Sequence, residues 1–288
     1  MHPVLIGPAG WSYADWEGVF YPPNPPKSFS QLEYLSRFFP VVEVNMTFYR
    51  IPPVSLIHKW LQTVERRDFK FCIKAWQGFT HQSAETSVET VQFMRCLEPI
   101  AERQRLAAVL LQFPWSFKYS PESLARLEQL LAIFRPHPCA VEFRHGSWQT
   151  PQVYDLLRQN RVAFVNIDQP VIGESIVPSD EVTAPFAYVR LHGRNRANWF
   201  RQDAGRDDRY NYLYSADELK EWEERISNMA EKAPTIVIFN NHFRGQATLN
   251  AFQLMYHLFK EPPMVPVTLK ASFPEELAFA RPDSLQLF

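Results

Sequence analysis

The chain contains little cysteine and lacks any long apolar run. Its three cysteines, Cys72, Cys96 and Cys139, are scattered and odd in number, which argues against a disulfide framework and favours small core residues of a reduced protein. No run of about 18 apolar residues is present, so the sequence predicts no membrane span. The N-terminus has no basic segment followed by an apolar stretch, so we expect no signal peptide and a cytoplasmic location.

The chain also lacks an excess of charge of one sign and the short motifs of several enzyme classes. Its formal net charge is −1, which argues against a strongly basic nucleic-acid-binding protein. No GxSxG, GxGxxG or P-loop pattern occurs, so the α/β-hydrolase, Rossmann and NTPase classes find no support. No HExxH or paired-histidine motif is present either, so no metalloprotease site is indicated.

What the chain does contain is a series of short apolar runs, nearly all of which end in a polar residue. They lie at residues 4–7, 41–45, 69–75, 107–113, 139–144, 162–168, 186–192 and 235–241. Continuous apolar runs are typical of parallel strands that are buried on both faces. Helical patterns separate most of the runs, and Ser215 with Glu218 forms a capping-box signature. The alternation predicts a (β/α)8 TIM-type barrel over residues 1–260.

Two segments depart from this alternation. Residues 169–185 contain Pro170, Pro178 and Pro185 and no helical stripe, so we expect an irregular sixth crossover. Residues 261–288 are proline-rich, and we expect a C-terminal extension that packs on the barrel or is partly free.

Polar residues recur two positions apart at the ends of several predicted strands, and side chains two apart share one face of a strand. The pairs are Glu43 with Asn45, Glu142 with Arg144, Asn166 with Asp168, and Arg190 with His192. We expect these faces to point into the barrel mouth, because the surrounding helices present an apolar surface. A buried polar group that is left unpaired costs about 1–3 kcal/mol, so this many polar ends favour a working site over packing.

Six stretches of the chain carry a recognisable pattern: IGPAGWSYADWEGVFYPP, VEVNMTFYRIP, LLQFPWSF, VEFRHGSW, RLHGR and FNNHFRGQATLNA. They resemble the YecE-like family, long labelled a domain of unknown function, over residues 4–260 and in the family's order. The resemblance implies a TIM-type barrel and no established reaction. The family fold is similar in outline to the xylose-isomerase and endonuclease-IV barrels, which use metal clusters. The family's polar positions match Glu43, Asn45, Lys74, Gln112, Glu142, Arg144, His145, Arg190, His192, Arg194, Asn240 and Asn241.

Arginines after the seventh and eighth runs favour an anion site. Barrels often bind phosphate there, beside a helix N-terminus, and arginine forks match phosphate oxygens. Arg190, Arg194 and Arg244 are therefore candidate ligands of a small anionic, phosphorylated molecule. We interpret the other arginines of this region as partners of its aspartates on a solvated loop: Arg201, Arg206 and Arg209 with Asp203, Asp207 and Asp208.

The acid–base candidates are Glu142 and Asp168, with His192 third and Glu43 in the same mouth. A structural ion pair with Arg144 is the alternative for Glu142. The further expected binding residues are Asn45, Gln112, Arg144, Asn240, Asn241, Trp11 and Tyr13.

Lys74, at the end of the third run, has two interpretations. It forms an ion pair with Glu43 or Glu142, or, if it is desolvated, it acts as a Schiff-base nucleophile.

Three functions follow from these residues. The first is an enzyme, namely a hydrolase, lyase or isomerase acting on a phosphorylated substrate. The second is a nucleic-acid-associated protein of the repair-nuclease kind, and the third is a non-catalytic ligand-binding barrel. No cofactor is predicted, and a divalent metal ion is an alternative that the adjacent arginine charge disfavours.

The C-terminus is similar to the peptide by which bacterial proteins dock on the DNA sliding clamp. Leu285, Leu287 and Phe288 fit the anchors of that peptide. The alternative is that these three residues pack back on the barrel.

Overall fold

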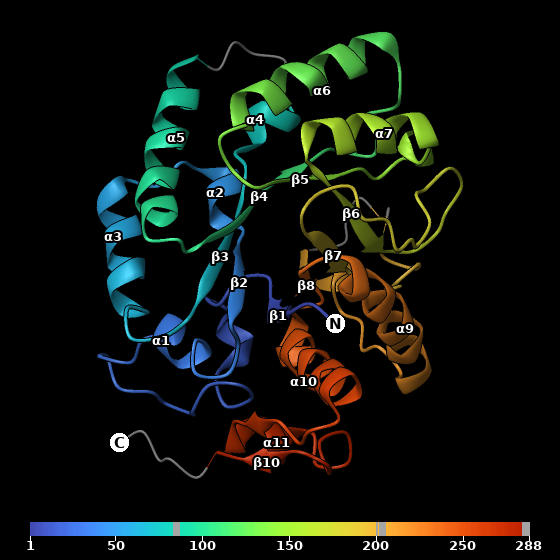
Figure 1. Ribbon diagram of the computed structural model, residues 1–288. Helices are drawn as coiled ribbons and strands as arrows, with labels where there is room; N and C mark the ends of the chain where they lie inside the picture. The colour runs from blue at the N-terminus through green and yellow to red at the C-terminus, as the bar shows by residue number, and fades with distance from the viewer. Residues whose placement is uncertain (83–86, 200, 202–205, 284–288) are drawn as a thin grey trace.

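The computed structural model describes residues 1–82, 87–199, 201 and 206–283. Figure 1 shows parallel strands in the centre and helices outside them. The strands form one sheet in the order β1-β8-β7-β6-β5-β4-β3-β2. Their bounds are β1 Val4–Pro8, β2 Val41–Val44, β3 Lys70–Lys74, β4 Leu106–Gln112, β5 Cys139–Glu142, β6 Ala163–Asp168, β7 Ala187–Leu191 and β8 Thr235–Phe239.

The sheet closes where β1 meets β2. Ala9 forms a parallel bridge with Glu43, and the Gly10 amide donates to the Glu43 carbonyl at 2.8 Å. A Cβ atom on Gly7 would lie only 1.9 Å from the Val41 carbonyl oxygen, so glycine is needed for this close approach. The predicted TIM-type barrel is confirmed.

Helices follow most of the strands, as the helical patterns predict. Their bounds are α1 Gln31–Leu35, α3 Val54–Thr63, α5 Ser87–Glu102, α6 Pro121–Phe134, α7 Pro151–Asn160, α9 Ala216–Lys232 and α10 Gln246–Phe259. At the start of α9, the Ser215 side chain accepts from the Glu218 amide and the Glu218 carboxylate accepts from the Ser215 amide. This capping box satisfies amides that the helix itself leaves without partners.

Short elements lie at several strand ends, and the apolar periodicity did not predict them because each is about one turn long. They are α2 Met46–Tyr49, α4 Gln77–Thr80, α8 Arg206–Arg209, η1 Ala14–Trp16, η2 Gly146–Trp148 and η3 Phe243–Gly245. The loops of the barrel mouth are therefore partly helical.

The sixth crossover is irregular, as expected. Residues 169–185, all of which the structure describes, contain no helix. Side-chain hydrogen bonds hold the segment to β6 and to the residue before it: the Glu181 amide donates to Asn166 Oδ1 at 2.8 Å, and Thr183 Oγ1 donates to the Val162 carbonyl at 2.6 Å.

The described part of the C-terminal extension packs against the rest of the chain. It contains β9 Met264–Val265, α11 Val267–Ser272 and β10 Arg281–Pro282, and its Leu269 and Leu277 are fully buried. Figure 1 shows α11 and β10 in red below α10. Leu285, Leu287 and Phe288 lie outside the described residues, so the docking peptide stays a prediction. No helix in the described part of the chain is long and apolar enough to cross a membrane.

The strand register determines which polar side chains face the barrel interior, because directly paired residues of parallel strands share a face. The paired sets that face inward are Glu43 with Cys72, Lys74 with Leu110, Gln112 with Glu142, and Ile167 with Arg190 and Ile238. Polar groups from β2, β3, β4, β5 and β7 therefore meet at the carboxyl ends of the strands.

Candidate functional site

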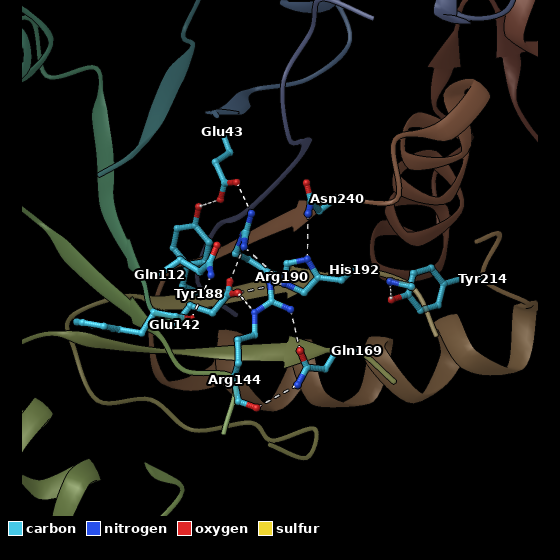
Figure 2. A network of polar contacts seen from close by, with 12 residues as sticks. Glu43, Gln112, Glu142, Arg144, Gln169, Tyr188, Arg190, His192, Tyr214 and Asn240 are labelled. Atoms are coloured by element: carbon cyan, nitrogen blue, oxygen red, sulfur yellow. Dashed lines mark hydrogen bonds and ion pairs between the residues drawn. The ribbon is translucent and has the colours of Figure 1, made fainter. Parts of the chain in front are cut away.

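Arg190 of β7 lies in the barrel interior between two carboxylates (Figure 2). Its Nη2 is 2.5 Å from Glu43 Oε1 on β2, and its Nη1 is 2.5 Å from Glu142 Oε2 on β5. Tyr188 of β7 donates to Glu43 Oε2 at 2.9 Å. All four side chains are at most 1% exposed, so this Arg190 cluster, made of Glu43, Glu142, Tyr188 and Arg190, is a desolvated network that connects three strands.

Glu142 has a second set of partners on its other oxygen. Oε1 lies 2.6 Å from Arg144 Nε and 3.4 Å from His192 Nε2. Burial acts to raise the pKa of Glu142, but the charges of Arg144 and Arg190 outweigh burial and hold that pKa well below its usual range. The ion pair of Glu142 with Arg144, which the sequence suggested as the alternative to an acid–base role for Glu142, is present. Glu142 is therefore an ionised structural group rather than a proton donor near neutral pH.

His192 completes this network as a neutral imidazole. The Asn240 amide Nδ2 lies 3.0 Å from His192 Nδ1, which fits a donated hydrogen bond and places the ring proton on Nε2, toward Glu142. Burial lowers the pKa of His192 to about 3, and the charge of Arg144 acts in the same direction.

We expect His192 to remain neutral through the physiological pH range. Its imidazole NMR resonances should not titrate between about pH 8 and pH 5, where an unperturbed histidine would. Because its native pKa lies below the ordinary value of 6.5, the unfolded chain takes up a proton that the native state excludes. The free energy of unfolding should therefore fall as the pH drops below that value. A titration of the His192 resonances near pH 6.5 would contradict this assignment.

Lys74, the last residue of β3, makes neither of the ion pairs expected for it. No carboxylate lies within ion-pair distance of Nζ among the described residues, because Arg190 already engages both Glu43 and Glu142. Its Nζ lies 4.1 Å from the centroid of the Phe48 ring. Burial lowers the pKa of Lys74 to about 7, and the charge of Arg190 contributes to this shift.

Replacement of Lys74 by methionine should stabilise the protein. The charged and titratable groups that face Lys74 are Glu43, His81, Glu142, Arg144 and Arg190. Burial and the two arginines together disfavour the ammonium, so Lys74→Met should raise the free energy of unfolding by about 0.5–2 kcal/mol. The gain should shrink as the pH rises from about 7 toward 10.5, because the native amine is already neutral there and the free-energy cost of removing the proton from the unfolded chain's amine falls as the pH approaches 10.5. Chemical denaturation at two pH values measures both effects, and a lower stability of the variant at neutral pH would contradict them.

A cavity of about 300 Å³ opens at the carboxyl ends of the strands, above the Arg190 cluster. Four basic side chains contribute to its wall, namely Lys74, Arg144, Arg190 and Arg209, and Asn45 and Gln112 also line it. No carboxylate of the described residues lines it. We call this space the mouth cavity. Tyr13 and Asn240, also predicted from the sequence, belong to its lining.

Asp168 points away from the mouth cavity, and the prediction that it faces the barrel mouth is wrong. It pairs in register with Leu191 on the outer face of the sheet, and its carboxylate accepts from Trp222 Nε1 of α9 at 2.5 Å and from Arg194 Nε at 3.0 Å. Asn166 faces the same way and contacts Met229 of α9. The expectation failed because α9 presents a polar indole N–H to β6 instead of an apolar surface.

Two of the three arginines predicted to bind an anion, Arg194 and Arg244, lie outside the mouth cavity. Arg194 is held by Asp168, Glu218 and Glu221, at 2.9 to 3.3 Å, and does not line the mouth cavity. Arg244 is exposed, and its guanidinium lies over the Phe243 ring.

Two further predicted binding residues also have structural partners away from the cavity. The Asn241 amide donates to the Tyr212 carbonyl and to Asn250 Oδ1, at 2.9 Å each. Trp11 packs edge-on against Trp60, with 5.4 Å between ring centroids.

Comparison with known proteins identifies the family of this chain but assigns it no reaction. The sequence profile described as "Protein of unknown function DUF72" matches residues 5–275. The chain belongs to the DUF72 family. The UPF0759 protein YunF of Bacillus subtilis is 33% identical over 273 residues, which cover 88% of this chain and 93% of YunF. The UPF0759 protein YecE of Escherichia coli O157:H7 is 26% identical over 185 residues, or 63% of this chain and 61% of YecE. The resemblance to the YecE-like family is confirmed.

Solved structures of DUF72 proteins share the fold. A DUF72 family protein of Thermotoga maritima is 35% identical, with a TM-score of 0.79 over 90% of this chain and all of that chain (100%). A DUF72 family protein of Enterococcus faecalis is 29% identical, with a TM-score of 0.78 over 89% of this chain and 95% of that chain.

Four residues of the mouth cavity in this DUF72 chain were not predicted as site residues: Tyr49, Arg209, Tyr210 and His242. The sequence interpretation placed Arg209 on a solvated loop, but its side chain lines the cavity. Tyr210 and His242 lie with 5.4 Å between their ring centroids. Arg209 and Tyr210 lie in the long connection after β7, where no strand periodicity indicates which side chains face the mouth.

The donor groups of this site do not suit a divalent cation. Glu43 and Glu142 are engaged by Arg190, and an arginine charge beside a metal ion is unfavourable. Within the ranges that the structure describes, no three side chains of His, Cys, Asp or Glu gather in the manner of a metal site. We therefore derive no step through a metal.

Proposed function

We propose that this DUF72 protein is an enzyme that acts on a small anionic substrate in the mouth cavity. One observation carries the proposal: four basic side chains and no carboxylate of the described residues line the cavity. The two carboxylates of the Arg190 cluster do not balance Arg144, Arg190 and Arg209. The site therefore holds at least one net positive charge even when Lys74 is neutral.

The anion ligands differ from those that the sequence suggested. Arg190 lies between two carboxylates and Arg144 pairs with one of them, so Arg209 and Lys74 are the groups that these carboxylates leave to meet a phosphate or carboxylate. Nε of Arg209 is buried and has no hydrogen-bond partner among the described residues, which is a donor position that an anion would satisfy. The cavity size fits a small metabolite, because small-molecule sites range from about 300 Å³ upward.

A thermal-shift panel tests this function. The panel holds inorganic phosphate, sugar phosphates, 2-keto acids, the matching uncharged sugars and a DNA oligonucleotide. A ligand at about 100 times its dissociation constant adds about 2.7 kcal/mol, so small anions should raise the melting temperature clearly. Arg209→Gln should weaken the shift, and Arg103→Gln, at an exposed arginine, should not.

The outcomes separate the alternatives. Stabilisation by uncharged sugars to the same extent as by their phosphates would contradict the proposal. A response to the oligonucleotide alone, reduced by added salt, would instead support the nucleic-acid-associated function.

A further inference from the structure

We propose that Lys74 is a nucleophile that forms an imine with the carbonyl carbon of a small anionic aldehyde, ketone or 2-keto acid. The proposal rests on the anion-binding function above, and it names the substrate class and the reacting atom.

The position of the amine favours this role. Lys74 lies at the end of β3, in the wall of the mouth cavity, and packs on Phe48 with 4.1 Å from Nζ to the ring centroid. Lysines that leave bulk water normally pair with a carboxylate. Here both nearby carboxylates are engaged by Arg190, at 2.5 Å each, so the ion pair that would keep the amine protonated and unreactive is absent from the described residues.

The arginine charges around the amine favour its neutral form. Arg190 and Arg144 line the same cavity as Lys74, and their positive charges disfavour an ammonium ion there. The pKa of Lys74 is accordingly lowered to about 7 by burial and by these charges, so an appreciable fraction is the neutral amine at neutral pH. A desolvated amine or an amine next to a second cation is activated as a Schiff-base nucleophile, because both conditions favour its neutral form.

An acceptor without a partner lines the same cavity as the amine. Asn45, directly after β2, lines the same cavity, and its Oδ1 is buried without a hydrogen-bond partner among the described residues. Buried acceptors are nearly always satisfied, so a lone one in a cavity points to a group that the substrate supplies. An imine N–H or a hydroxyl of the substrate would satisfy it, while Arg209 Nε would meet the anionic end.

The reaction step balances without an oxidant or reductant. The lone pair of neutral Nζ forms a bond to the carbonyl carbon, and the carbonyl π electrons move to oxygen. Nζ loses a proton and the oxygen gains one, which gives a carbinolamine. Loss of the hydroxyl as water, with the second amine proton, leaves the carbon–nitrogen double bond. Once protonated, this imine withdraws electrons from the adjacent carbon, which is the use that lyases and isomerases make of it.

Reductive trapping tests the proposal. The full-length protein is mixed with pyruvate or dihydroxyacetone phosphate and sodium cyanoborohydride, which delivers hydride to the imine carbon and fixes a secondary amine. We expect one adduct per chain by intact mass, and peptide mapping should place it on Lys74. Lys74→Arg should abolish the adduct, whereas Lys59→Arg, at an exposed lysine on α3, should leave it unchanged.

The controls separate this proposal from the anion site. Lys74→Arg and Lys74→Met are first shown to fold by circular dichroism and are then tested for stabilisation by inorganic phosphate. No adduct with either probe, while phosphate still stabilises the wild type, would overturn the imine and leave the anion site standing. Adducts spread evenly over surface lysines would also overturn it. A wild type that inorganic phosphate does not stabilise would contradict the proposed function itself.

Discussion

Replacement of Arg190 by methionine should lower the free energy of unfolding by about 3–5 kcal/mol, because it leaves two buried carboxylates without a counter-charge. Glu43 and Glu142 are 0% exposed and lie 2.5 Å from the Arg190 guanidinium. Tyr188 and Arg144 each retain one contact with these carboxylates and cannot replace the guanidinium that bridges them. Urea denaturation followed by circular dichroism at neutral pH measures the loss.

Three matched variants sharpen this prediction. Arg103→Met makes the same chemical change at an exposed position and should be nearly neutral. Arg190→Lys keeps the charge, but a single ammonium group cannot bridge two carboxylates as the guanidinium does. Its free energy of unfolding should therefore lie between those of Arg190→Met and the wild type. Replacement of both carboxylates by glutamine together with Arg190→Met should recover part of the loss. A small effect of Arg190→Met alone would show that the cluster is not a structural element.

Replacement of Asp168 by alanine should lower the free energy of unfolding by about 2–4 kcal/mol, since it removes a buried acceptor of two donors. Trp222 Nε1 would lose its hydrogen bond of 2.5 Å inside the β6–α9 interface. Arg194 would lose the buried member of its acidic partners and keep Glu218 and Glu221. Thermal and urea unfolding measure the change.

Asparagine at position 168 is the matched control, because its side-chain oxygen still accepts from Trp222 while the charge is gone. Asp168→Asn should therefore lower the free energy of unfolding less than Asp168→Ala does. Burial raises the pKa of Asp168 despite its donors, which is consistent with an acid whose charge is only partly compensated. Equal losses in the two variants would mean that the indole hydrogen bond contributes nothing.

The fold was largely predictable from the sequence because apolar runs, helix caps and prolines are local signals. The strand bounds and the irregular crossover follow from them. Alternation along the strands also located Glu43, Glu142 and Arg190 correctly on the inner face, because the partner strands present the matching register. The same reasoning failed for Asp168, because alternation alone does not say which face of β6 is the polar one.

The site was less predictable because it depends on which polar ends pair with one another. Alternation places Arg190 in the mouth, but only the three-dimensional arrangement shows that two carboxylates neutralise it. The role of Lys74 follows from that pairing and could not be chosen from the sequence. Arg209 and Tyr210 come from a loop with no periodicity, so no sequence signal separated them from their solvated neighbours.

A calorimetric titration with a charged and uncharged pair of ligands tests the central claim, which is a mouth cavity that selects small anions. Dihydroxyacetone phosphate and dihydroxyacetone differ only in the phosphate. We predict binding of the phosphate ester and none of its uncharged counterpart, with affinity at least about tenfold weaker in Arg209→Gln, since a charge-assisted hydrogen bond contributes about 1.5–3 kcal/mol. Arg103→Gln should bind as the wild type does. Equal binding of the two ligands, or an unchanged affinity in Arg209→Gln, would contradict the account.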